Sequence, residues 1–400
     1  MSDLAVAEHP GADTGEWTFG PIVDADAHID PPHDMWANYL PASQKAKAPV
    51  IEEGDECDWI LFEGTRRPVR MISNQAGRAG KDFKMIGKLS EQRAVWDSHL
   101  RLADMDSDGI NSAILFGGGP LGTFDNELYM ASYEAYQNWV MDWCSTDKRR
   151  LVPIGYVPMR DIDETIGHIQ RLAKMGFKAV NLPAFPQNPD GWSTSSGVSA
   201  LKEGQVSALT GDPKGALQYY QPEFDRLWTV ICDLDLVVTM HLGGRVPRFG
   251  DAQHFLPDMP MSKMAMAEPV GIFIFNAIFQ RFPKLKLVQV ESGVGWFAWY
   301  CEYITRTWEK QRFWTESPLT ESPAYYMENN VYGSFIQDRV GIVSRNLPGA
   351  GNIMWSSDYP HSETTFPNSH SIIQRDFAGV PEADIRDIIC NRARNLYGLD

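Results

Sequence analysis

The chain has 400 residues, of which 43% are hydrophobic and 22% are charged, a composition typical of a globular protein with enough apolar residues for a large core. Its formal net charge is −16, and the lysines and arginines are scattered, which argues against nucleic acid or an anionic membrane surface as a partner. The N-terminal residues lack a basic stretch followed by an apolar one, and no apolar run approaches the length of a membrane span, so we expect neither a secretory signal nor a membrane helix.

The chain is predicted to alternate strand and helix after a loose arm at residues 1–20. The expected strands lie at 22–28, 112–116, 151–157, 178–182, 236–240, 285–290, 330–335 and 353–355. The expected helices lie at 97–108, 127–146, 161–175, 222–234, 269–281, 296–308, 338–346, 369–378 and 381–396. Most of these strands are nearly continuous apolar runs, as expected for parallel strands with both faces covered.

Three segments depart from this alternation. Residues 31–96 are predicted to form an insertion that caps the barrel mouth, with a hairpin made by Trp59–Phe62 and Arg67–Met71. Residues 183–221 and 242–266 show no clear period and are predicted loops, the first of them long enough to serve as a lid or an interface arm.

Eight strands separated by helices predict one domain at residues 21–400, a (β/α)8 TIM-type barrel with a long insertion after strand 1 and a long loop after strand 4. An open doubly wound sheet is the alternative. Such a sheet usually has a glycine fingerprint after its first strand, whereas this position holds Asp26-Ala27-His28.

Polar side chains stand at the ends of several expected strands. Asp26 and His28 are two residues apart, so they point to the same side of an extended strand, roughly 7 Å apart along the backbone. His241 follows the fifth strand, Glu291 the sixth, and Asp358 comes after the eighth. Because the carboxyl ends of barrel strands meet at one face, these groups converge, and their nitrogen and oxygen donors suit Zn, Mn or Fe.

These stretches resemble the amidohydrolase superfamily, in its amidohydrolase 2 branch of decarboxylases and hydrolases. The resemblance rests on the segments that surround the strand ends, namely Val23–Pro32, Met240–Gly244, Val290–Trp296 and Trp355–Pro367. It implies a (β/α)8 barrel with a metal at Asp26, His28, His241 and Asp358.

Two features depart from that pattern. Relatives in this branch have a histidine at the end of strand six that polarises the substrate, whereas this chain has Glu291. A carboxylate there can act as a general base, as a partner of a ligand histidine or as a ligand itself. Binuclear hydrolases of the superfamily use a carbamylated lysine at the end of strand four, but here the run from Lys178 ends in Asn181.

Each candidate residue can also have a purely structural role instead of a role in metal binding. His241 can be a core histidine, Asp358 can cap the turn that follows it, and Glu291 can cap the helix expected at Trp296. His361 is placed either as a ligand or as a partner of one, and Asp30 is expected to order the Pro31-Pro32 turn. If Glu291, Asp30 and His361 join the site, its donors approach those of a dinuclear Fe or Mn centre.

The main hypothesis is that the protein is a metal-dependent enzyme that decarboxylates or hydrolyses a small carboxylated substrate, with one or two divalent ions (Zn, Mn or Fe) per chain. Glu291 or Asp358 would transfer the proton, and Arg245 would either bind a substrate carboxylate or form a surface ion pair. The alternatives are a dinuclear Fe/Mn hydroxylase that uses O2, as some relatives of the branch do, and a non-catalytic partner subunit.

The cellular location and the oligomeric state of the protein are also predicted. The five cysteines are widely separated and odd in number, which favours reduced thiols and a cytoplasmic location over a disulfide framework. We expect the chain to form a homo- or hetero-oligomer of related barrels.

Overall fold

The computed structural model describes residues 17–32, 34–71, 73–78, 80–91, 93–117, 119–186, 218–242 and 252–399. Most of the predicted arm, most of the 183–221 loop and part of the 242–266 loop lie outside these ranges. Within them, no helix is long and apolar enough to span a bilayer.

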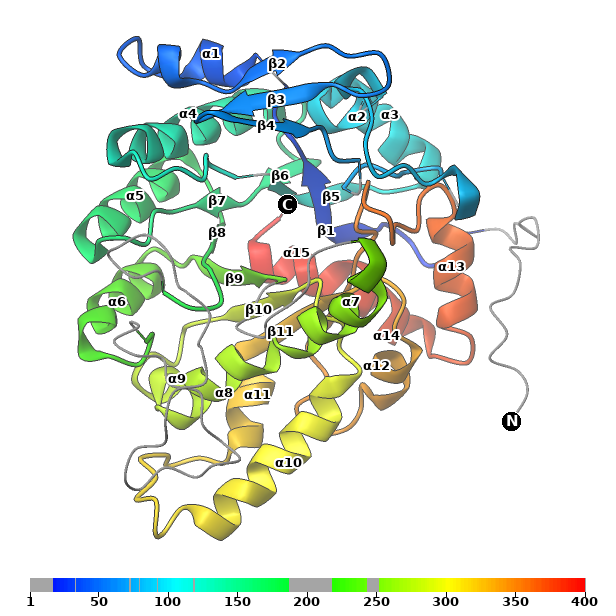
Figure 1. The fold of residues 1–400 in the computed structure, drawn as a ribbon. Helices are drawn as coiled ribbons and strands as arrows, with labels where there is room; N and C mark the ends of the chain where they lie inside the picture. The colour runs from blue at the N-terminus through cyan, green and yellow to red at the C-terminus, as the bar shows by residue number, and fades with distance from the viewer. Residues whose placement is uncertain are drawn as a thin grey trace.

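A ring of parallel strands forms the centre of the described chain (Figure 1). In sequence order these are β1 (Val23–Ile29), β5 (Ser112–Gly117), β6 (Leu151–Pro153), β7 (Gly155–Tyr156), β8 (Ala179–Asn181), β9 (Val237–His241), β10 (Leu287–Val290), β11 (Val331–Phe335) and β12 (Ile353–Trp355). Each pairs in parallel with its sequence neighbour, first from β1 to β6 and then from β7 to β12. The expected third strand is interrupted at Ile154, so that β6 belongs to one sheet and β7 to the other.

The ring closes where the chain that follows β12 meets β1. The N–H of Asp358 donates to the carbonyl of Asp26 at 2.9 Å, and the N–H of His28 donates to the carbonyl of Tyr359 at 2.6 Å. These bonds bring the eighth expected strand back to the first. The predicted (β/α)8 barrel is therefore confirmed.

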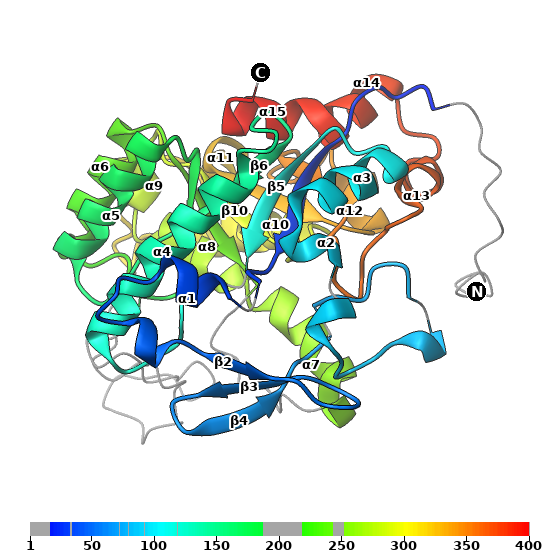
Figure 2. The same ribbon diagram turned by 90° about the horizontal axis from the view of Figure 1, so that it is seen from above.

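Helices surround the ring (Figures 1 and 2). They are α3 (Ser98–Asp108), α4 (Asn126–Cys144), α5 (Ile162–Met175), α6 (Asp225–Asp233), α8 (Ala267–Phe275), α9 (Ile278–Arg281), α10 (Trp296–Gln311), α11 (Pro323–Asn330), α12 (Arg339–Ser344), α13 (Ser369–Asp376), α14 (Glu382–Arg386) and α15 (Arg392–Tyr397). Local chemistry sets the ends of α3: the Asp97 carboxylate accepts the N–H groups of His99 and Leu100, and Gly109 ends the helix with a φ of 75°.

The insertion after β1 forms a small antiparallel sheet of β2 (Val50–Glu52), β3 (Trp59–Phe62) and β4 (Thr65–Pro68), with the helices α1 (Met35–Tyr39) and α2 (Arg93–Trp96) on either side in sequence. The predicted hairpin is present, but its second strand begins two residues earlier than expected, at Thr65 rather than Arg67, and ends at Pro68. Its turn residues Glu63 and Gly64 have φ values of 46° and 73°, as a tight two-residue hairpin requires. A cavity of about 590 Å³ lies between this sheet and the residues that follow β1 and β5.

Two expected elements differ from the structure. The predicted loop 242–266 contains a helix, α7 (Phe255–Met264), which has no apolar face and holds Pro260 in its interior, and therefore shows no helical period in the sequence. The single helix expected at 269–281 is divided into α8 and α9, because Ala277 between them has a φ of 55°.

Candidate metal centre

The predicted site residues come from four strand ends. Asp26 and His28 lie in β1, and His241 is the last residue of β9. Glu291 directly follows β10, and Asp358 lies three residues beyond β12. The ends of these strands share one side of the barrel, and thus residues far apart in the sequence come together.

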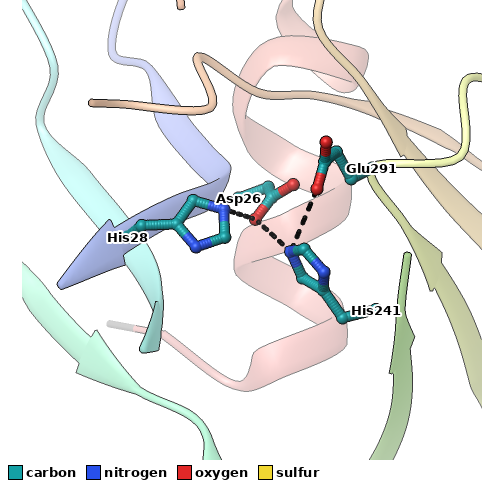
Figure 3. A group of neighbouring side chains, drawn as sticks. All are labelled: Asp26, His28, His241 and Glu291. Atoms are coloured by element: carbon teal, nitrogen blue, oxygen red, sulfur yellow. Dashed lines mark ion pairs between the residues drawn. The ribbon is translucent and has the colours of Figure 1, made fainter. Parts of the chain in front are cut away.

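Asp26 lies at the centre of a first group with His28, His241 and Glu291 (Figure 3). Its Oδ1 lies 3.3 Å from His28 Nε2 and 3.5 Å from His241 Nε2. Glu291 Oε2 lies 3.6 Å from the same Nε2 atom of His241. One ligand atom from each of these residues falls within 4.8 Å of all the others.

A second group contains His28, Glu291, Asp358 and His361. Asp358 Oδ1 lies 3.0 Å from His28 Nε2 and 3.1 Å from His361 Nδ1. The imidazoles of His28 and His361 stack with their centroids 3.6 Å apart. The two groups share His28 and Glu291, and so the six predicted ligands form two overlapping clusters.

The donor atoms fit a cation. Both carboxylate oxygens of Asp26 and of Asp358, and the Nε2 atoms of His28 and His241, are buried and make no hydrogen bond in the described structure. Buried polar atoms without partners are costly. A divalent ion would satisfy them, because carboxylate and imidazole donors are those that Zn, Mn and Fe accept.

The charges in the cluster are strongly coupled. Burial alone would raise the pKa of Asp26, but the imidazoles of His241 and His28 hold that pKa below its usual range. Burial alone would lower the pKa of His28, but Asp26 and Asp358 hold it well above its usual range. Burial, reinforced by the nearby Asp358 carboxylate, raises the pKa of Glu291 to about 8. The acids and the imidazoles of the site therefore compensate one another's charge.

Two of the site residues have unusual backbone conformations. Glu291 has a φ of 56° and Asp358 a φ of 54°, both in the left-handed region that side chains other than glycine rarely adopt. Such strain is retained where the surrounding structure imposes it, and it concentrates at functional sites. In both cases the carboxylate belongs to the cluster and lies within three residues of the end of a strand.

A cavity of about 670 Å³ adjoins the cluster. Glu291 forms part of its wall, together with aromatic side chains and polar groups from α7 and from the segments after β10, β11 and β12. Lys263 of α7 also lines it and pairs with Glu363. A chamber of this size can hold a small organic molecule beside the cluster.

Other predicted residues are placed differently. Arg245 lies within 243–251, outside the described residues. Lys178 is exposed, and Asn181 accepts a hydrogen bond from Thr239 at 3.1 Å, which agrees with the expectation that strand four carries no lysine ligand. Asp30 lines the cavity beneath the insertion sheet.

Two residues that the structure places beside the site, Asp24 and Lys263, are not among those predicted from the sequence. Asp24 precedes Asp26 by the same two-residue spacing that singled out Asp26 and His28, but the pairing of β1 with β5 shifts register after Asp24, so the spacing alone does not give its position. Lys263 was assigned to a loop, and nothing in the sequence connects it with the strand ends.

Comparison with known proteins decides the family. The profile described as amidohydrolase matches residues 23–399. The chain belongs to the amidohydrolase family. The predicted resemblance, and with it the assignment to a family of metal-dependent enzymes, is confirmed.

Solved structures share the fold of this amidohydrolase. One is an amidohydrolase from Mycobacterium avium subsp. paratuberculosis, with a TM-score of 0.68 and 17% identity over 95% of this chain and 98% of that one. A second is 2,6-dihydroxybenzoate decarboxylase from Rhizobium, with a TM-score of 0.63 and 16% identity over 95% and 99%. A third is a dihydroxybenzoic acid decarboxylase from Polaromonas sp. JS666 with bound manganese and 2-nitroresorcinol, with a TM-score of 0.61 and 15% identity over 95% and 97%.

Proposed function

We propose that this amidohydrolase is a metal-dependent enzyme that decarboxylates a small aromatic carboxylate, with hydrolysis as the related activity of the same centre. The observation that carries the proposal is the convergence of two overlapping groups, one of Asp26, His28, His241 and Glu291 and one of His28, Glu291, Asp358 and His361. Within each group the ligand atoms lie within 4.8 Å of one another. Decarboxylation is favoured over hydrolysis because structural neighbours act on dihydroxybenzoates.

Asp26, His28, His241 and Asp358 would hold the metal, with manganese preferred because it is bound in the Polaromonas neighbour. The ion would supply Lewis acidity that orients a substrate carboxylate and polarises the adjacent bond. His361, which contacts Asp358 at 3.1 Å, would orient that ligand.

The substrate would occupy the 670 Å³ cavity. Trp296 and Phe335 line it and offer apolar surfaces to an aromatic ring, while Gln337 offers an amide to a polar substituent. Glu291 belongs both to the cavity wall and to the cluster. Its carboxyl group is therefore placed to exchange a proton with a carbon of the substrate, the step that replaces the lost carboxylate by hydrogen.

The proposal is tested with protein stripped of metal and reloaded with Mn²⁺ or Zn²⁺, using 2,6-dihydroxybenzoate and 5-carboxyvanillate as probes. Metal-dependent CO2 release without consumption of O2 supports it. Absence of metal binding by the wild-type protein contradicts it, and would favour the non-catalytic subunit.

A dinuclear O2-dependent hydroxylase is a second candidate, favoured by the overlap of two ligand groups at His28 and Glu291. Two Fe or Mn ions per chain, with O2 uptake matched to product, would support that candidate instead. Oligomer formation, a cytoplasmic location and a substrate contact by Arg245 stay predictions.

A further inference from the structure

The strand that carries Asp26 and His28 is irregular just before them. Its pairing with β5 shifts register between Asp24 and Ala27, which places an extra residue in β1, as in a β-bulge. In a regular strand Asp24 would face the same way as Asp26 and His28. Instead its carboxylate turns toward the chain that follows β12.

Asp24 joins the two segments that carry the acidic ligands. Its Oδ1 accepts the N–H of Asp26 at 3.1 Å and the N–H of Ser357 at 2.9 Å. Its Oδ2 accepts the hydroxyl of Ser357, and that hydroxyl accepts the N–H of Tyr359 at 3.1 Å. One buried carboxylate thus binds the backbone of Asp26 and both polar groups of the residue before Asp358.

Arg101 of α3 stabilises the same junction between β1 and the chain that follows β12, which we call the seam. It is 1% exposed, its guanidinium donates to the carbonyl of His28, and it lies 4.2 Å from the centroid of the Tyr359 ring. The hydroxyl of Tyr359 in turn donates to Asp104 at 2.5 Å. The backbone on both sides of the seam is therefore fixed by buried polar groups that do not themselves belong to either ligand cluster.

We infer that Asp24 is a positioning residue, which holds in place for metal binding the Asp26 and Asp358 carboxylates that both contact His28 Nε2. The inference rests on the proposed metal centre. Asp24 contributes no donor atom to either group and acts through the backbone of the two ligands. Loss of groups that orient metal ligands typically weakens metal binding roughly 10–100-fold.

The chain supplies a matched control in Asp108. This carboxylate is also buried and accepts both the N–H (2.9 Å) and the hydroxyl of one serine, Ser369. That pair joins the end of α3 to the start of α13 and touches no predicted ligand. Asp24→Ala and Asp108→Ala each remove the two hydrogen bonds that a carboxylate accepts from one serine. Only Asp24→Ala also removes a bond to the backbone of a predicted ligand, Asp26.

The test measures Mn²⁺ and Zn²⁺ affinity by titration, with circular dichroism as a check on folding. We expect Asp24→Ala to weaken binding at least about 10-fold and Asp108→Ala to leave it unchanged. Asp24→Asn retains the oxygen that accepts both N–H groups, so it should recover much of the affinity. If Asp24→Ala does not fold, Ser357→Ala compared with Ser369→Ala decides by the same criterion.

Each result has a distinct meaning. Equal affinity in the Asp24 and Asp108 variants, or in the two serine variants, overturns the positioning role and leaves the metal centre intact. Wild-type protein that binds neither ion overturns both the metal centre and this inference. Weakened binding in Asp24→Ala that is largely recovered in Asp24→Asn supports the inference whatever substrate the enzyme proves to use.

Discussion

His28 and Asp358 face each other across the seam that closes the barrel, with Nε2 and Oδ1 3.0 Å apart. They come from opposite ends of the chain, yet the N–H of His28 donates to the carbonyl of the residue after Asp358. The same two segments thus close the barrel and bring ligands of the candidate metal centre together. Changes to this seam should therefore affect both the barrel and the metal centre.

Replacement of His241 by alanine should abolish metal retention. His241 supplies the only nitrogen donor from β9 among the described residues, and its Nε2 lies between Asp26 and Glu291. We expect a loss of affinity greater than the roughly 10–100-fold typical of residues that only orient a ligand. Elemental analysis after dialysis measures it, with His168→Ala on the outer helix α5 as the control. Equal metal content in the two variants would exclude His241 as a ligand.

Replacement of Glu291 by glutamine separates one metal from two. Glu291 belongs to both ligand groups, so a dinuclear centre should lose its second ion, since a neutral amide bridges two cations poorly. A mononuclear centre should keep its ion and turn over more slowly. Metal-to-protein ratios and initial rates distinguish these cases. If neither the ratio nor the rate changes, Glu291 has no part in the site.

Asp108 should make stability depend on pH. Burial, with a contribution from Asp104, raises the pKa of Asp108 from 3.8 to about 6 in the folded protein, although Ser369 opposes the shift. The folded protein then binds a proton more tightly than the unfolded chain does. The resulting stabilisation is complete below about pH 4 and is lost as the pH rises through 6.

Asp108→Asn removes this dependence. Relative to the wild type, the free energy of unfolding of the variant should increase by roughly 2 kcal/mol between pH 4 and pH 7, at 1.36 kcal/mol per pKa unit. Urea unfolding at several pH values measures the difference. Parallel stability curves for the two proteins would show that Asp108 does not titrate in this range.

Gly109 and Gly176 test the helix ends. Both end a helix with positive φ, at 75° and 98°, so alanine should cost about 1–2 kcal/mol at each. At Gly109 the new Cβ would also lie 2.1 Å from His370 Nε2, whereas at Gly176 it would meet nothing within 4 Å. Gly109→Ala should therefore lower the free energy of unfolding more than Gly176→Ala. The opposite order in urea unfolding would refute this placement of His370.

The sequence predicted the strand ends well because parallel strands direct their carboxyl ends to one face. This rule alone brought Asp26, His241 and Asp358 together. The rule could not predict Asp24, because a register shift within β1 turns it away from its neighbours. It also could not predict α7, where Pro260 interrupts a segment without an apolar face. Nor could it show that the ligands divide into two overlapping groups, since that depends on side-chain positions.

The most direct test of the central claim is a crystal structure of Mn²⁺-loaded protein with an anomalous difference map at the manganese edge. We predict a peak within bonding distance of Asp26, His28, His241 and Asp358. A peak elsewhere, or one that lacks His241 or Asp358 among its ligands, would contradict the account.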